Sequence, residues 1–191
     1  MGFEGNYGLH VPMKLSEFTA RAEDIAACRR RSRSAISVKV NSELSPVVIP
    51  SGVGDVMHAF GEQVIVHLGG VQTGGKIALW TEITPSNGGP PPHYHLNEDE
   101  FFFVQEGKMA FLRDGQWEQV ERGGVAFMPR KSVHTFKNVG DAPSKMLIST
   151  TPAGFEIFFA RCAEEFAKSE GPDMERIVAI SAEHGIHYVT P

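Results

Sequence analysis

Short apolar segments separated by turn residues fill the middle of the chain, from residue 46 to residue 152. The dipeptide Asp114-Gly115 lies between two such segments, and Asp-Gly in this setting is a strong signal for a two-residue β-hairpin turn. Short strands at even spacing with frequent turns are typical of a β-sandwich or a β-barrel and disfavour a helical bundle. The expected strands cover residues 64–68, 77–84, 100–105, 108–113, 117–120, 125–129, 133–139 and 145–150.

The segments on either side of this region have a different character. Residues 1–45 are expected to form an N-terminal extension, and residues 153–191 a C-terminal helical segment. Between Phe155 and Ala167 apolar residues recur at the spacing of one helix face, and Asp173 is the expected start of a second short helix. The sequence therefore predicts one barrel domain over residues 46–152, with the C-terminal helices packed on its outside.

Charge and cysteine content limit the partners of the chain. Its 191 residues include 18 Lys and Arg against 23 Asp and Glu, a net charge of −5, whereas nucleic-acid-binding proteins are normally basic. No apolar run reaches the roughly 18 residues that a membrane-spanning helix needs. The two cysteines, Cys28 and Cys162, allow one disulfide at most, as is usual in a reducing compartment. We therefore expect a cytoplasmic protein that binds neither nucleic acid nor membrane.

Three histidines and one glutamate stand in apolar strand segments at spacings that suit a metal ion. His93 and His95 are two residues apart, which on a strand places both imidazoles on one face, about 7 Å apart at Cα. Glu100 opens the next apolar strand, and His134 is a candidate third imidazole. A lone histidine in a strand is usually structural. A set of three with a carboxylate predicts a site for a divalent cation.

The first of these stretches resembles the first conserved motif of the cupins. In that motif His-x-His is followed by three or four residues, a glutamate, six residues and a glycine. The corresponding residues here are His93, His95, Glu100 and Gly107. The glycine that opens the motif falls at Asn87, a departure that concerns turn geometry and not a metal ligand.

A second stretch resembles the second cupin motif. That motif reads glycine, five residues, Pro-x-Gly, two residues, histidine, three residues and asparagine. Its residues here are Gly123, Pro129, His134 and Asn138, while Lys131 replaces the internal glycine. Together the two motifs extend from Asn87 to Asn138.

This resemblance implies an all-β fold, the double-stranded β-helix or jelly-roll barrel of the cupins, with an N-terminal extension and C-terminal helices. It also implies that one divalent transition metal is bound by His93, His95, Glu100 and His134. Three imidazoles and a carboxylate with open coordination positions suit Fe, Mn, Ni, Co or Cu, and Zn also accepts such ligands.

At a finer level the chain is similar to the quercetin 2,3-dioxygenase-like cupins. The similarity lies in Pro-Pro-Pro-His-Tyr-His over residues 90–95, in Asp99-Glu100, and in the segment 151–156 that leads into a helix. It implies a metal-dependent dioxygenase acting with O₂ on an aromatic or enolic small molecule, with Glu100 as the catalytic residue that takes a proton from a substrate hydroxyl. Two alternatives stay open: a metal-dependent isomerase or decarboxylase that uses no O₂, and a non-enzymatic cupin that binds a small ligand.

Apolar side chains near the expected metal site favour a flat, hydrophobic substrate over a sugar or a dicarboxylate. An oxalate site would need an arginine near the metal, and Arg113 and Arg130 fit turn or strand-end positions better. Cupins are often dimers, so a homodimer paired through an edge strand at Val47–Ile49 is a further expectation. The expected substrate pocket contains Phe102, Val104, Phe111, Phe127, Phe136 and Phe155, with simple core packing as the alternative role of these residues.

Overall fold

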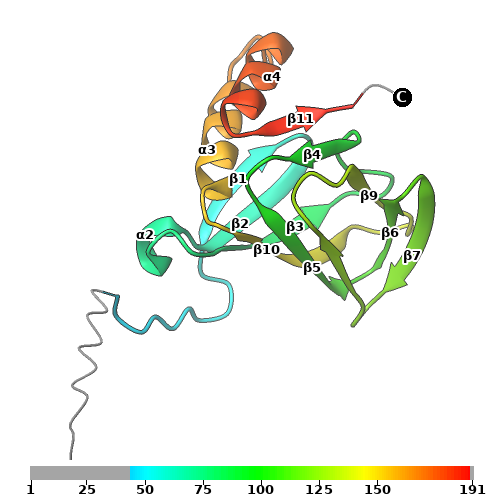
Figure 1. Cartoon of the computed structure of the whole chain (residues 1–191), viewed down its shortest axis with the longest axis horizontal. Coiled ribbons are helices and arrows are strands. Elements are labelled where there is room, and N and C mark those ends of the chain that lie inside the picture. The colour runs from blue at the N-terminus through cyan, green and yellow to red at the C-terminus, as the bar shows by residue number, and fades with distance from the viewer. Residues whose placement is uncertain (1–43, 190–191) are drawn as a thin grey trace, which may run out of the picture. The chain divides into compact units, whose positions relative to one another are not determined.

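The computed structural model describes residues 44–189, so nearly all of the expected N-terminal extension lies outside the described residues. These residues form two antiparallel sheets, shown in Figure 1, with strand orders β1-β2-β3-β10-β5-β8 and β11-β4-β9-β6-β7. The all-β prediction is confirmed. Within the described residues, no helix has the length and apolar character needed to cross a membrane.

The eight expected strands correspond closely to β2, β3 and β5 to β10, whereas β1 was not expected. The first sheet contains β1 (Asp55–Ala59), β2 (Glu62–Leu68), β3 (Ala78–Thr84), β10 (Ser144–Thr151), β5 (Asp99–Glu106) and β8 (Val125–Met128). The second contains β11 (Ile186–Tyr188), β4 (His93–His95), β9 (His134–Asn138), β6 (Lys108–Arg113) and β7 (Gln116–Glu121). The helices are α2 (Gly70–Thr73), α3 (Phe155–Phe166) and α4 (Met174–Glu183).

Turn chemistry joins these strands as the sequence indicates. Asp114 and Gly115 connect β6 to β7 with φ values of 50° and 78°, the positive values that a type I′ turn requires at both positions. The two departures from the cupin motifs also lie at positive φ, with 64° at Asn87 and 70° at Lys131. Asparagine tolerates this region, whereas for lysine it costs roughly 1–2 kcal/mol.

The core forms where the inward-facing positions of both sheets meet the apolar face of α3. Alternate residues of each strand are buried, as on β5, where Phe102 and Val104 are almost fully enclosed. Helix α3 buries Phe155, Phe158, Phe159 and Cys162 of its expected stripe, and each fully buried large side chain contributes about 1.5–3 kcal/mol. Asp173 caps α4 by accepting hydrogen bonds from the backbone N–H groups of Glu175 and Arg176, at 3.0 and 3.2 Å.

The C-terminal segment, expected to be helical, also contains a strand. Strand β11 pairs with β4, with Ile186 opposite His95 and Tyr188 opposite His93, and Figure 1 shows it beside β4. Its three residues are too few to show strand periodicity in the sequence. Residues 44–54 form no strand with the rest of this chain, and the pairing of Val47–Ile49 with a second copy stays a prediction.

Candidate metal centre

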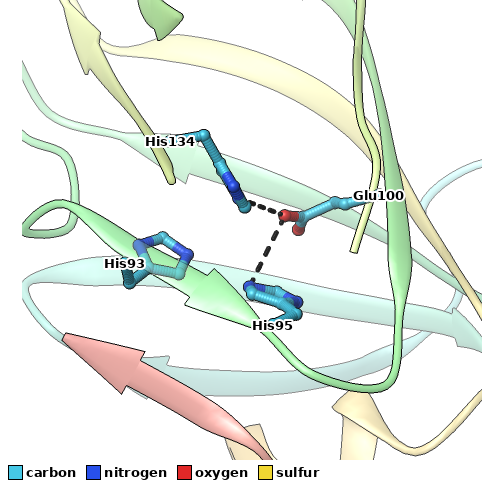
Figure 2. A group of neighbouring side chains, drawn as sticks. All are labelled: His93, His95, Glu100 and His134. Carbon is cyan, nitrogen blue, oxygen red and sulfur yellow. Dashed lines mark hydrogen bonds and ion pairs between the residues drawn. The ribbon is translucent and has the colours of Figure 1, made fainter. Parts of the chain in front are cut away.

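Four buried side chains converge between the two sheets. Figure 2 shows His93 and His95 on β4, His134 on β9 and Glu100 on β5, with their side chains directed toward one another. One ligand atom from each lies within 4.8 Å of all the others. Oε2 of Glu100 is 3.2 Å from Nε2 of His134 and 3.8 Å from Nε2 of His95. The structure thus brings together all four residues that the sequence predicts as metal ligands.

Backbone carbonyls fix the orientation of two imidazole rings. Nδ1 of His93 lies 2.8 Å from the carbonyl oxygen of Pro91, and Nδ1 of His134 lies 2.9 Å from that of Ser132. Because a carbonyl only accepts, each Nδ1 carries a proton, and each Nε2 is the ring nitrogen left to bind a metal. This is the usual arrangement of a histidine that binds a metal through Nε2.

His95 gives a direct test of whether the cluster fits a metal ion. Its side chain is 1% exposed, and neither ring nitrogen has a hydrogen-bond partner among the described residues. Glu98 and Glu100 each place an oxygen 3.8 Å from one of these nitrogens, beyond hydrogen-bond distance. A buried nitrogen without a partner is costly, and a metal ion would give it one. Three imidazoles and a carboxylate therefore fit a divalent transition metal.

Two of the three imidazoles and the carboxylate of the cluster have pKa shifts that favour the form that binds metal. Burial lowers the pKa of His93 to about 4, with His134 and His95 contributing in the same direction. Burial also lowers the pKa of His95. For Glu100 burial alone would raise the pKa, but His95 and His134 bring it below its usual value. His134 differs, because burial alone would lower its pKa but the adjacent Glu100 raises it. A divalent cation binds neutral imidazoles and an ionised carboxylate, so at His134 it would replace a proton that Glu100 stabilises.

The start of β5 is held in place by an ion pair next to the cluster. Arg130 donates from Nε and Nη2 to the two carboxylate oxygens of Asp99, at 3.0 and 2.8 Å, and its backbone N–H donates at 2.9 Å. These hydrogen bonds hold the pKa of Asp99 at about 2. Arg130 is thus paired with Asp99, the residue next to Glu100, and Arg113 is paired with Glu118 on the β6–β7 hairpin. Neither arginine lines the cavity described next.

A cavity of about 60 Å³ adjoins the cluster, and His93 and Glu100 form part of its wall. Two further carboxyl groups, Glu62 and Glu82, also line it. Among the described residues, no lysine or arginine contributes to the wall. Most of the remaining surface is aromatic and comes from Phe60, Phe136, Phe155, Phe158, Phe159 and Tyr188.

The predicted pocket residues separate into three groups. Phe136 and Phe155 line the cavity. By contrast Phe102, Val104 and Phe111 are buried in the core outside the cavity wall, the alternative role named for them above. The prediction is wrong for Phe127, which is 59% exposed because it lies opposite Phe101 on the outward face of β5 and β8.

Two wall residues, Glu62 and Glu82, were missed from the sequence. A signal for them exists, since each occupies an inward position on a strand whose neighbouring inward residues are apolar, such as Val64 on β2 and Trp80 on β3. Charged residues at such positions are rarely buried without a role.

Comparison with known proteins agrees with this architecture. The family model described as "Cupin domain" matches residues 79–150, which include all four clustered residues. Over 121 residues the chain is 26% identical to quercetin 2,3-dioxygenase of Bacillus subtilis, covering 63% of this chain and 36% of that enzyme. Over 82 residues it is 27% identical to an uncharacterized protein of Methanocaldococcus jannaschii, covering 43% of this chain and 66% of that protein. The chain thus spans between about a third and two thirds of the length of these relatives.

Two solved structures show the same fold. One is a predicted oxalate decarboxylase of Thermotoga maritima, with a TM-score of 0.50 and 18% identity, covering 56% of this chain and 99% of that one. The other is the polyketide cyclase RemF of Streptomyces resistomycificus, with a TM-score of 0.50 and 19% identity, covering 56% of this chain and 80% of that one. These two structures share the fold, and the family-model match together with the two-sheet barrel identifies a cupin domain within this chain.

Proposed function

We propose that this protein is a metal-dependent dioxygenase that acts on an aromatic or enolic small molecule, as quercetin 2,3-dioxygenase does. The observation that carries the proposal is a buried cluster of three histidines and one glutamate that opens onto an aromatic cavity without a cationic side chain. Such a wall favours a neutral, flat ligand and disfavours an anion such as oxalate. The similarity to the Bacillus subtilis enzyme over 121 residues supports the same class of substrate.

Each part of the site has a distinct task in this reaction. His93, His95 and His134 would hold the metal, which when bound supplies a Lewis acid for a substrate oxyanion and, if redox-active, a means of using O₂. Glu100 is ionised and faces the cavity, so it can take the proton of an enol or phenol hydroxyl. The aromatic wall keeps water away from the deprotonated substrate.

The size of the cavity sets a condition on substrate entry. About 60 Å³ is well below the roughly 300–1,000 Å³ of pockets that enclose drug-sized ligands. A flavonol therefore requires part of the wall to move. Phe155 and Phe158 lie on one face of α3, where a small shift of the helix or of their side chains would enlarge the cavity.

The test is anaerobic addition of quercetin to protein loaded separately with Fe²⁺, Mn²⁺, Co²⁺, Ni²⁺ or Cu²⁺, followed by admission of O₂. We expect a shift of the quercetin absorption with at least one metal, and then uptake of O₂. Glu100→Gln should retain the metal, show only a weak absorption shift and take up no O₂. Glu118→Gln, on the exposed hairpin, should behave like the wild type. Absence of both the shift and O₂ uptake with every metal contradicts the proposal. Conversion of quercetin without O₂ uptake would point to an isomerase or decarboxylase.

A further inference from the structure

Two glutamates in the barrel interior have no part in the proposed chemistry of Glu100. Glu62 on β2 is 7% exposed and Glu82 on β3 is 3% exposed. Both occupy inward positions, and the β2–β3 register places Glu82 directly opposite Val64. Burying a carboxyl group among apolar residues costs stability unless its oxygens are bonded. Their presence therefore calls for a role.

The two carboxyl groups form a pair that leaves one oxygen free. Each shifts the pKa of the other, and the indole N–H of Trp80 donates to Oε2 of Glu82 at 3.0 Å. Oε1 of Glu62, by contrast, is buried and has no partner among the described residues. Trp80 thus orients Glu82, and the neighbouring Glu62 keeps a buried oxygen that has no hydrogen-bond partner among the described residues.

The same pair lines the cavity that His93 and Glu100 share. Burial raises the pKa of Glu82 well above its usual value, the adjacent Glu62 adds to this rise, and burial also raises the pKa of Glu62. Two adjacent carboxyl groups can share one proton, and such a pair both donates and accepts a hydrogen bond. A hydroxyl group of a ligand is a suitable partner in either role.

We propose that Glu62, beside Glu82 in the cavity wall, is a second substrate-binding group that hydrogen-bonds a ligand oxygen other than those facing the metal ligands. This inference rests on the proposed function and narrows its substrate class. The ligand is a neutral, polyoxygenated aromatic or enolic compound, with two neighbouring oxygens for the metal site and at least one more for Glu62. The absence of lysine and arginine from the described cavity wall argues against an anionic group at this position.

Catechol and pyrogallol provide a matched pair of probes, because pyrogallol adds one hydroxyl group to the same ring. Both are titrated calorimetrically under argon into the full chain loaded with Co²⁺. We expect the wild type to bind pyrogallol about tenfold more tightly than catechol, the value of one additional hydrogen bond. Glu62→Met should bring this ratio close to one, while Glu62→Gln, which still donates and accepts, should retain most of it. Glu118→Gln on the exposed hairpin is the control.

The outcomes separate this inference from the function on which it rests. Equal binding of both probes by the wild type, or an unchanged ratio in Glu62→Met, overturns the role of Glu62 and leaves the proposed function standing. Failure of the Co²⁺-loaded wild type to bind either probe overturns both. Metal content and thermal unfolding are recorded for each variant. If Glu62→Gln loses the preference for pyrogallol over catechol as fully as Glu62→Met, Glu62 has a structural role only and the proposal is overturned.

Discussion

Phe155 connects helix α3 to the metal-ligand cluster, and its replacement by alanine tests that packing. Its ring is stacked with two others. The ring centroid is 5.1 Å from those of both Trp80 and His95, and the interplanar angles are 8° and 10° respectively. Phe158 and Phe159 pack against it from the same helix, with ring centroids 5.1 and 5.0 Å from that of Phe155. The side chain is 8% exposed, so nearly all of its surface is buried against these partners and the cavity.

The expected loss of stability follows from these contacts. Truncation of a buried phenylalanine to alanine costs about 3–5 kcal/mol in most proteins. Since one side of Phe155 already faces a cavity, fewer contacts are lost than at a fully packed site, and we expect the lower part of that range, about 3–4 kcal/mol. For a chain of this length, that corresponds to a fall in Tm of about 6–16 °C.

The assay is urea unfolding of metal-free protein, followed by circular dichroism, so that metal affinity does not enter the measured stability. Ile157→Ala is the matched control, because Ile157 lies on α3 and is 55% exposed. It should change the free energy of unfolding by about 0.5 kcal/mol or less. A loss below about 1 kcal/mol for Phe155→Ala would refute the stacking of α3 on the cluster, because no well-packed phenylalanine is so easily removed.

Three further predictions concern the metal, a buried amide and the carboxyl pair. At a free metal concentration 100 times Kd, removing the metal should lower the free energy of unfolding by about 2.7 kcal/mol. In a thermal melt this corresponds to a fall in Tm of about 5–11 °C. His95→Ala should abolish the difference between metal-loaded and metal-free protein, and His58→Ala should not. Asn138→Ala should cost about 3 kcal/mol in urea unfolding, because the fully buried amide bonds the carbonyls of Thr84 and Ala142 and the N–H of Gly140. Since the folded-state pKa of Glu82 is raised, its contribution to stability decreases as the pH rises above the unfolded value of 4.5. Glu82→Gln should therefore gain stability relative to metal-free wild type from pH 5 to pH 8, and a constant difference across these pH values would contradict the sign.

The strands and the metal ligands could be predicted because the information lies close together in the sequence. His93 and His95 share one short strand, and Glu100 begins the next strand only a few residues later, so local periodicity brings them together. His134 is more distant, but it begins its own strand and pairs directly with His93. For these residues strand alternation alone decides which side chains face the interior.

The carboxyl pair and the last strand depend on information that local patterns do not contain. Glu62 and Glu82 are twenty residues apart, and only the register of β2 on β3 places them together. Strand β11 has three residues and forms because β4 presents an unpaired edge. For Phe127 the wrong face of the sheet was predicted. Strand alternation shows that neighbouring side chains point to opposite faces, but it does not show which of them faces inward.

The pairing of β11 with β4 also bears on the order in which the protein matures. Strand β4 pairs with β9 at a single position, His93 with His134, and otherwise relies on β11. During synthesis the histidine strand therefore lacks one neighbour until residues 186–188 have left the ribosome, long after its own residues. We expect metal loading to follow translation of this segment: nascent chains stalled with residue 188 still inside the exit tunnel should retain less Co²⁺ than chains released from it. Equal retention of Co²⁺ by stalled and released chains would show that β4 can present its metal ligands without pairing to β11.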